Sequence, residues 1–304
     1  MRKPNIAIVG VGRWGKKLLA TFAEHGNVVA ACHHGSPATQ EWLQHEFPAL
    51  RTTTNIQDIL HDNSIQVVVI ATPIATHFEL TKSALLAGKD VFVEKPLTNT
   101  AREARTLATL ATKSQRIVNV GHVFCYHEAF TKLQSLVKND PVTHAQFTWN
   151  KWGTFNESIY WNLTCHDVAL AQLLMGTPRT ATLLSSLGAL TKEDSIVARL
   201  TFPGGREAII STNRIALPRE TAGGAKQKIL TIRTKSGKLL IWDDESLYTW
   251  NEATQSTTTL FTSKTTALET EVRTFLRCVQ TRKQPLTDAA FGATVVATVE
   301  RLTR

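Results

Sequence analysis

The amino-acid sequence predicts an α/β protein, with an N-terminal doubly wound parallel sheet of Rossmann type and a C-terminal α+β domain built on an open, mostly antiparallel sheet. Two observations predict the first domain: apolar runs alternate with helical stretches, and a glycine-rich turn follows the first run. Successive strand-like runs past residue 180 predict the second domain. A chain of 304 residues with 42% hydrophobic content can bury two cores, so we expect domains at residues 1–120 and 121–304.

The apolar runs of the first half show almost no alternation with polar residues, which is typical of strands covered on both faces of a parallel sheet. They occupy residues 6–9, 28–32, 66–70 and 90–93. Between them, residues 14–25, 75–86 and 101–113 favour helix. Right-handed crossovers through such helices predict a Rossmann-like arrangement.

The second half begins with a helix at residues 165–174, which Gly176 and Pro178 end. Strands are expected at residues 181–190, 195–202, 207–215, 228–233, 238–242 and 246–250. Turn residues such as Gly204 and Gly237 separate several of these strands, which favours antiparallel pairing. Residues 266–282 and 288–304 are expected to form closing helices, and the last one is expected to return to the first domain.

The composition is that of an ordinary globular protein. No apolar stretch approaches the ~20 residues of a membrane helix, and the N-terminus lacks the layout of a signal peptide, so we expect a cytoplasmic protein with no membrane partner. The four cysteines lie far apart without a Cys-x-x-Cys pair, which predicts reduced thiols. The net charge of +9 is spread over both halves and is densest at residues 199–238. A solvated sheet face is favoured over nucleic acid, and attraction for a phosphate or an anionic sugar stays open.

The glycine-rich turn between the first strand and the first helix has the spacing of a dinucleotide fingerprint, Gly10-Val11-Gly12-Arg13-Trp14-Gly15. Gly10 permits the tight turn, Gly12 lets the backbone approach a pyrophosphate, and Gly15 lets the helix pack close to the strand. The helix N-terminus then directs unpaired amide groups at the phosphates. Arg13 and Trp14 are expected beside the cofactor. We therefore predict NAD(P) binding.

The end of the second strand bears on the choice between NAD and NADP. An acidic residue there binds the ribose 2'-hydroxyl of NAD, but this chain has Cys32-His33-His34-Gly35-Ser36. His33 and His34 can donate hydrogen bonds to a 2'-phosphate, which favours NADP. The alternative is that both histidines are merely exposed loop residues.

The tripeptide Glu94-Lys95-Pro96 closes the run at residues 90–93 and places an ionisable amine at the end of a buried strand. A doubly wound sheet has its active site at this end of its strands, and a lysine is costly to desolvate. A surface lysine that follows a strand is the alternative.

Several segments together resemble the glucose-fructose oxidoreductase, inositol dehydrogenase and MocA (Gfo/Idh/MocA) family of NAD(P)-dependent oxidoreductases. They are Ala71-Thr72-Pro73 with His77, Gly88-Lys89-Asp90-Val91, Glu94-Lys95-Pro96-Leu97, Gly121-His122-Val123-Phe124, and Trp161-Asn162-Leu163-Thr164-Cys165-His166-Asp167. The second-domain segments resemble most the branch that acts on nucleotide sugars or related pyranosides.

The resemblance implies roles for individual residues. Lys95 would meet the nicotinamide and the substrate hydroxyl, Pro96 would follow a cis peptide bond, and His166 would transfer a proton. The family commonly has an aspartate four residues before this histidine, whereas this chain has Asn162, whose amide cannot accept a proton as a carboxylate does. The further residues expected to line the cofactor site are Thr72, Pro73, His77 and Glu94.

Substrate contacts are expected from Lys95 and His166 and from five residues between them in sequence. Asn162 and His166 are four residues apart, so on an α-helix they would project from one face. The expected substrate-side residues are His122, Tyr126, Lys151 and Trp152, besides Asn162. No set of His and Cys has the compact spacing of zinc ligands, so we expect no metal. A structural pairing of His166 with Asp167 is the alternative to catalysis.

The leading hypothesis is an NAD(P)-dependent oxidoreductase that transfers hydride to or from a secondary carbinol of a sugar, nucleotide sugar or cyclitol, with Lys95 and His166 in proton transfer. A second hypothesis keeps the site but eliminates a glycosidic substituent with retained NAD. A third, encouraged by Asn162, is a regulatory dinucleotide-binding protein without catalysis. The resemblance also implies a homo-oligomer that pairs through the C-terminal sheet.

Overall fold

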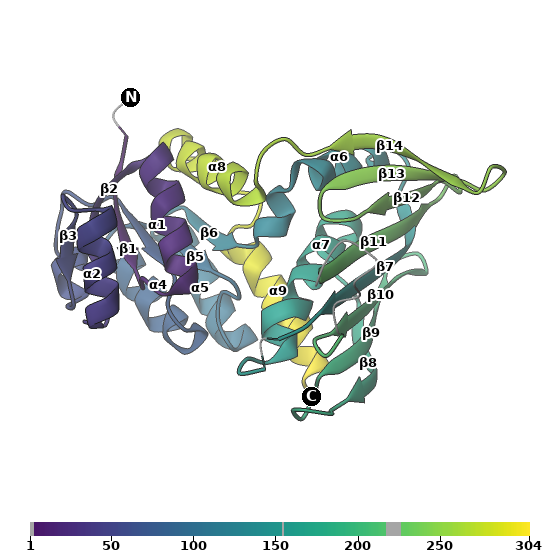
Figure 1. Cartoon of the computed structure of the whole chain (residues 1–304), viewed down its shortest axis with the longest axis horizontal. Coiled ribbons are helices and arrows are strands. Elements are labelled where there is room, and N and C mark those ends of the chain that lie inside the picture. Colours follow the sequence, from purple (N-terminus) through teal and green to yellow (C-terminus); the bar gives the residue numbers. More distant parts are fainter. Residues whose placement is uncertain (1–2, 154, 217–225) are drawn as a thin grey trace. The chain divides into compact units, whose positions relative to one another are not determined.

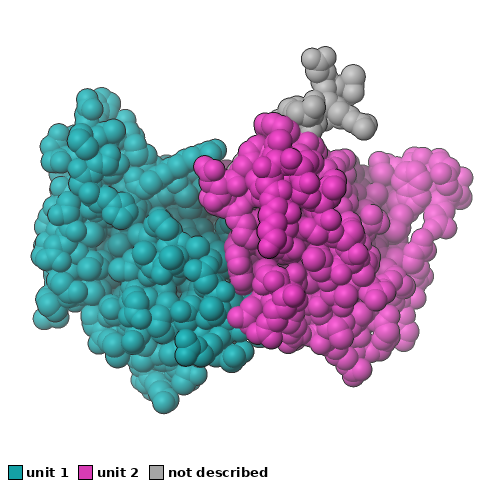
Figure 2. Space-filling model, turned by 90° about the horizontal axis from the view of Figure 1, so that it is seen from below, with its two compact units in different colours: residues 1–122, 268–296 teal, residues 123–267, 297–304 magenta. Residues whose placement is uncertain are grey.

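The computed structural model describes residues 3–153, 155–216 and 226–304. The chain forms two compact units (Figure 2). The first comprises Met1–His122 and Leu268–Val296, and the second comprises Val123–Ala267 and Ala297–Arg304. Among the described residues, no helix combines the length and the apolar character needed to span a membrane.

The first unit contains a six-stranded parallel sheet with the order β3-β2-β1-β4-β5-β6 (Figure 1). Its strands are β1 (Asn5–Val9), β2 (Asn27–Cys32), β3 (Arg51–Thr53), β4 (Val67–Ile70), β5 (Asp90–Glu94) and β6 (Val118–Gly121). The order reverses between β1 and β4, and this is the crevice in which doubly wound sheets bind ligands. The predicted Rossmann-type sheet is confirmed.

The helices of the first unit come from both ends of the chain. They are α1 (Arg13–His25), α2 (Pro37–Glu46), α3 (Gln57–Leu60), the 3₁₀ turn η1 (Ile74–Thr76), α4 (His77–Leu86), α5 (Ala101–Lys113), α8 (Ala267–Thr281) and the first part of α9 (Ala289–Leu302). Helix α5 begins where Thr100 accepts a hydrogen bond from the Glu103 amide, so its local sequence sets its start.

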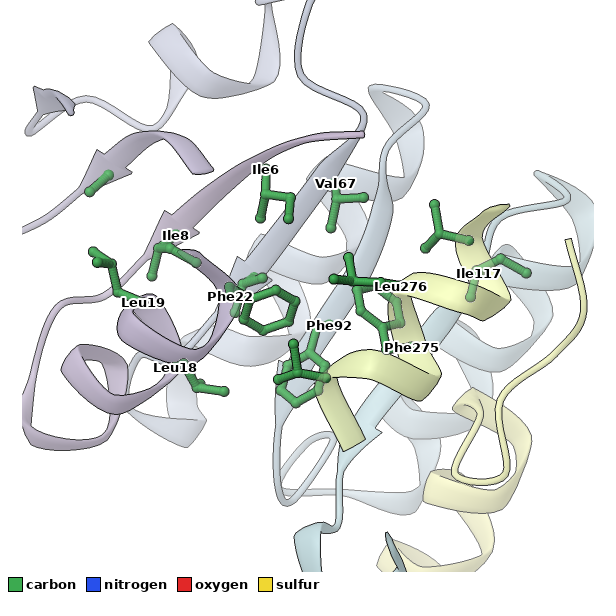
Figure 3. Packing of buried hydrophobic residues seen from close by; sticks show 14 of the residues in the cluster. Ile6, Ile8, Leu18, Leu19, Phe22, Val67, Phe92, Ile117, Phe275 and Leu276 are labelled. Atoms are coloured by element: carbon green, nitrogen blue, oxygen red, sulfur yellow. The ribbon is translucent and has the colours of Figure 1, made fainter. Parts of the chain in front are cut away.

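The core between α1, α8 and the sheet is aromatic at its centre (Figure 3). Phe22 of α1, Phe92 of β5 and Phe275 of α8 meet edge to face, with 5.4 Å between the Phe22 and Phe92 ring centroids and 5.5 Å between those of Phe92 and Phe275. Burying each ring contributes about 1.5–3 kcal/mol. The last third of the chain thus supplies part of the core that supports the first strands.

The second unit contains an eight-stranded sheet with the order β14-β13-β12-β11-β7-β10-β9-β8. Its strands are β7 (Val142–Lys151), β8 (Thr180–Leu187), β9 (Ser195–Phe202), β10 (Arg206–Asn213), β11 (Lys226–Thr234), β12 (Leu239–Trp242), β13 (Ser246–Asn251) and β14 (Ser256–Thr262). Only β7 and β10 pair in parallel among these strands, which confirms the predicted open, mostly antiparallel sheet.

One face of this sheet carries the helices of the second unit (Figure 1). Helix α6 (Glu128–Val137) packs on β12, β13 and β14, and α7 (Cys165–Met175) packs on β7 and β10. The short turn η2 (Val123–Tyr126) contacts both helices. No described helix covers the other face, on which alternate residues of β9 and β10 are partly exposed.

Some elements differ from the sequence-based expectation. Helix α2 and the three-residue strand β3 were not expected, because they lack an apolar stripe. Helix α6 was also not expected, although Phe130, Leu133 and Val137 form a buried stripe along it. The chain before α7 forms a π-helical turn, η3 (Tyr160–Thr164), where a continuous α-helix was expected. Asn162 lies in this wider turn, so the α-helical spacing to His166 does not apply unchanged. All four cysteines are buried free thiols.

Candidate cofactor and active site

The glycine-rich turn follows β1 and faces the turn after β4. Gly10 has φ +91°, and a Cβ there would lie 2.6 Å from the Ala71 carbonyl oxygen. A Cβ on Gly15 would overlap the Gly10 carbonyl oxygen. Both positions therefore require glycine for the packing of the turn itself, before any ligand is considered.

Gly12 differs from these two glycines. A Cβ at Gly12 would meet no atom within 4 Å, so space lies open beside the backbone at this point. Helix α1 starts immediately after Gly12, with no side-chain cap and no acidic residue in its first turn. Its first amide groups thus lack side-chain partners at the positive end of the helix dipole. Open space beside free amides fits the pyrophosphate of a dinucleotide.

The end of β2 carries both a candidate 2'-phosphate donor and an acidic neighbour. His33 is buried, and its Nδ1 accepts a hydrogen bond of 3.0 Å from the Gly35 amide, so the proton of the neutral ring sits on Nε2. His34 is exposed. Burial, and to a smaller extent the nearby charge of Asp58, raises the pKa of Cys32. Asp58 belongs to α3, and the sequence analysis did not identify it as an acidic residue near the end of β2.

Glu94 is buried at the end of β5 and accepts a hydrogen bond from the indole N–H of Trp14. Its other oxygen accepts from the Lys95 amide at 3.3 Å. Burial raises the pKa of Glu94 to about 7, although the Trp14 bond and the charge of Lys95 act in the opposite direction. Glu94 therefore links the first turn of α1 to the lysine turn.

His77 joins the two turns that follow β4 and β5. Its Nδ1 lies 2.9 Å from the Pro96 carbonyl oxygen, and its Nε2 lies 2.9 Å from the Thr72 carbonyl oxygen. Carbonyl oxygens only accept, so a neutral ring donates to one of them and an imidazolium donates to both. Burial lowers the pKa of His77 against the opposing effect of the two carbonyls. The Lys95–Pro96 peptide bond is cis, as the family resemblance implies.

Two further buried ionisable groups lie behind this turn. His122 packs edge to face against Phe291, and burial, with the charge of Lys95, lowers its pKa to about 3, so the ring is neutral. Glu271 of α8 accepts a bond of 3.4 Å from Asn119. Burial and the charge of Glu94 raise the pKa of Glu271 well above its ordinary value. Two neighbouring buried carboxyl groups thus favour holding a proton.

His166 of α7 lies in an aromatic cluster of the second unit. Its ring centroid is 5.0 Å from that of Phe124, in an edge-to-face arrangement, and 5.5 Å from that of Trp149. The imidazole is 7% exposed. Packing on two sides fixes the plane of the ring, which a proton-transferring histidine requires.

Asp167, the next residue, forms a buried ion pair with Lys228 of β11. The Lys228 ammonium also lies 3.8 Å from the Trp149 ring centroid and 4.7 Å from that of Phe124, so it shares both rings with His166. Lys228 and Trp149 stand directly opposite each other on β11 and β7. The charged partner of Asp167 is therefore Lys228, a residue that the sequence analysis missed.

The remaining candidates of the second unit differ in exposure. Tyr126 is buried, and Asn162 and Lys151 are partly exposed. Trp152 is 45% exposed, with its indole against Phe155 at 5.3 Å between ring centroids. Because these residues and His166 belong to the second unit and Lys95 to the first, their expected meeting stays a prediction.

The structure thus brings together most of the cofactor-side candidates within the first unit. Trp14 donates to Glu94, and His77 bonds the turns at Thr72 and Pro96. Gly10 packs against the same Ala71-Thr72 turn, and Gly12 leaves open space beside it. Arg13 begins α1 in the same turn, and Pro73 caps η1 beside Thr72. No three His, Cys, Asp or Glu side chains of the described residues gather as metal ligands.

Comparison with known proteins gives a family for the first unit. Residues 4–122 match the family GFO_IDH_MocA, described as "Oxidoreductase family, NAD-binding Rossmann fold". The resemblance inferred from the sequence motifs is therefore confirmed, and with it an NAD-binding Rossmann domain.

Curated relatives are similar over part of their length. The uncharacterized oxidoreductase YdgJ of Escherichia coli (strain K12) is 28% identical over 193 residues, which are 58% of this chain and 56% of that protein. The scyllo-inositol 2-dehydrogenase (NADP(+)) IolW of Bacillus subtilis (strain 168) is 26% identical over 157 residues, 47% of this chain and 44% of that protein. The matches to these two relatives thus span about half of their length.

Solved structures share the whole fold at low identity. UDP-N-acetylglucosamine 3-dehydrogenase GnnA from Acidithiobacillus ferrooxidans superposes with a TM-score of 0.88 at 21% identity, covering 99% of this chain and 97% of that one. GenD2 from gentamicin A biosynthesis, in complex with NAD, has a TM-score of 0.80 at 20% identity, covering 100% and 94%. At this identity the likeness establishes the fold.

Proposed function

Because residues 4–122 match the Gfo/Idh/MocA oxidoreductase family, we propose that the chain is an NAD(P)-dependent oxidoreductase acting on a secondary carbinol of a sugar, nucleotide sugar or cyclitol. The observation that carries this proposal is the lysine at the end of β5, held in a turn that His77 and Glu94 tie to its neighbours. The named substrates of IolW and GnnA, a cyclitol and a nucleotide sugar, lie in the same chemical class.

The residues of the first unit fit a dinucleotide. The open space at Gly12 and the uncapped start of α1 would hold the pyrophosphate. A bound nicotinamide supplies the hydride acceptor or donor. Glu94 and His77 would hold the Lys95 turn in place during hydride transfer.

Proton transfer is assigned to two groups. Lys95 would exchange the proton of the substrate hydroxyl, and His166 would be its partner on the substrate side. Ring packing by Phe124 and Trp149 supports a fixed direction for the imidazole. Lys151, Trp152, Tyr126 and His122 would line the substrate site.

We favour NADP over NAD. In support, β2 ends without a carboxylate of its own and His33 keeps Nε2 for a 2'-phosphate. Asp58 near Cys32 acts in the opposite direction, since its charge would repel that phosphate. A direct comparison of the two dinucleotides decides between them.

The decisive experiment is a fluorescence titration with NADH and NADPH, followed by a screen of nucleotide sugars, pyranosides and cyclitols for a change in nicotinamide absorbance. We expect tighter binding of NADPH and turnover of at least one sugar-like alcohol. Lys95→Ala should abolish turnover while it leaves cofactor binding measurable. Cofactor binding without turnover of any substrate would contradict the catalytic proposal.

Asn162 favours a second candidate, in which the chain binds a dinucleotide without the usual dehydrogenation. Asn162 stands where a carboxylate would support the usual dehydrogenation. Its amide is therefore compatible with an elimination that retains NAD and also with a regulatory role. Asn162→Asp separates the cases: a large gain in alcohol oxidation indicates a weakened dehydrogenase, and an unchanged rate indicates that Lys95 and His166 suffice.

We also propose that the chain forms a homo-oligomer and acts in the cytoplasm. The sheet face of the second unit that no described helix covers would bury its side chains against a second copy. Four buried free cysteines suit a reducing compartment. Light scattering of the purified protein measures the subunit number.

A further inference from the structure

A cavity of about 860 Å³ lies at the amino-terminal edge of the six-stranded sheet. It opens beside Asn5 before β1, Gln66 before β4, Asp90 at the start of β5 and Arg116 before β6, and the end of α8 completes its wall. The glycine turn and Lys95 follow the opposite ends of β1 and β5. The cavity is therefore separate from the proposed active site, and its volume is that of small-ligand sites.

Positive charge dominates this cavity. Lys3, Lys89, Arg116 and Arg282 line it, and the acidic residue among its lining is Asp90. Both carboxylate oxygens of Asp90 are already occupied. Arg282 donates to both of them, at 2.5 and 3.1 Å, and the Ile117 amide donates to one at 2.8 Å. Asp90 thus neutralises Arg282 and does not pair with Lys3, Lys89 or Arg116.

Lys89 is buried without a carboxylate partner. Its ammonium donates to the carbonyl oxygens of Asp62 and Ile65, at 2.7 and 2.9 Å, and within the described part of the chain it forms no ion pair. Burial lowers the pKa of Lys89, and Arg116 acts in the same direction, while the Asp62 charge opposes both. The Asp62 carboxylate is itself held by Arg51 at 2.6 Å. A buried cation bonded to neutral groups alone carries an uncompensated desolvation cost.

Arg116 brings a second cation to the same place. Its guanidinium makes no hydrogen bond or ion pair with any residue that the structure describes, and it packs over Gly88, where a Cβ would lie 3.5 Å from Nη2. The planar fork of a guanidinium matches two oxygens of a phosphate group, and the ammonium of Lys89 adds a point charge beside it.

We propose that this cavity binds a small phosphate-bearing molecule between Arg116 and Lys89. A dianionic phosphate would offset the charges of these two lining residues, and the side-chain amides of Asn5, Asn63 and Gln66, which also line the cavity, would contact the uncharged remainder. The site does not depend on the proposed oxidoreductase activity. It would give part of the +9 charge of the chain a role in ligand binding at the sheet edge opposite the glycine turn.

Thermal unfolding of the full chain tests the proposal, with inorganic phosphate and glycerol 2-phosphate as probes and sodium chloride matching the ionic strength. At a hundredfold excess over Kd, we expect the Tm to rise by roughly 5 °C. Arg116→Gln should abolish this rise. Arg105→Gln removes the same charge from an exposed position of α5 and should keep the rise. A larger response to the ester than to inorganic phosphate identifies recognition of the organic part, and equal responses identify free phosphate as sufficient.

Phosphate binding at the glycine turn is distinguished by the same variants. If both probes raise the Tm of Arg116→Gln as much as that of Arg105→Gln, the anion binds elsewhere and the proposal is overturned. It is also overturned if neither probe raises the Tm of the unmodified chain above the chloride control. Broadening of the ³¹P resonance of glycerol 2-phosphate gives a second reading, which Arg116→Gln should remove and Arg105→Gln should keep.

Discussion

The buried Asp167–Lys228 pair offers the sharpest test of the second unit. Both side chains are 2% exposed, so removing either residue breaks an ion pair in the interior. Such a loss costs about 3–5 kcal/mol of the free energy of unfolding. We expect this cost for Lys228→Met, which keeps the aliphatic stem over Trp149, and for Asp167→Asn, which keeps the shape of the carboxyl group.

The double variant Lys228→Met/Asp167→Asn should be far more stable than the sum of the single changes implies. It removes both charges together, and the cation–π contacts with Trp149 and Phe124 that it loses contribute about 1–2 kcal/mol. The coupling between the two positions should therefore amount to several kcal/mol, at or above the upper end of the usual range.

Urea unfolding followed by circular dichroism measures all four species of this cycle. The ion pair of Lys238, which is 67% exposed, with Asp140 at 3.9 Å provides the control, and Lys238→Met should change the free energy of unfolding by less than about 1 kcal/mol. Additive single effects, or single effects no larger than this control, would refute the assignment of Asp167 and Lys228 as a mutually dependent buried pair.

Two further expectations concern the first unit. Gly10→Ala should lower the free energy of unfolding by at least about 2 kcal/mol, because φ +91° and the Ala71 carbonyl oxygen both oppose a Cβ. Gly12→Ala should keep the Tm and weaken NADPH binding. Equal Tm losses in the two variants would contradict this distinction. Glu94, with its pKa raised from 4.5 to about 7, holds a proton when folded that it loses when unfolded, so its contribution to the free energy of unfolding falls by about 3 kcal/mol as pH rises through that window. Chemical denaturation at pH 5 to 8 should show this slope in the wild type and a flatter one in Glu94→Gln.

The features that could be predicted from the sequence are those that depend on neighbouring residues. Gly10 and Gly15 occupy a turn whose backbone geometry allows little else, and their spacing between a strand and a helix predicts that turn. The strands β4 and β5 are short uninterrupted apolar runs, so their burial on both faces follows from composition.

The features that could not be predicted depend on contacts between distant segments. Lys228 is in phase with Leu230 and Ile232 on the buried face of β11, which was a signal, but a lysine in a strand normally indicates the exposed face. Glu271 lies four residues before Phe275 on the apolar side of α8, and its neighbour Glu94 is far away in the sequence. The π-helical turn at Asn162 has no pattern of its own that distinguishes it from an α-helix.

The aromatic contact of Phe275 with Phe22 and Phe92 has a consequence for biosynthesis. The six strands of the Rossmann sheet are synthesised about 150 residues before α8. During translation, one face of that sheet therefore lacks the helix that covers it. A fragment that stops at residue 122 would present this apolar surface to solvent and to other chains. The dinucleotide-binding motif is contiguous in the sequence, but the domain that carries it is not. Its core is complete only after α8, near the C-terminus, has been synthesised.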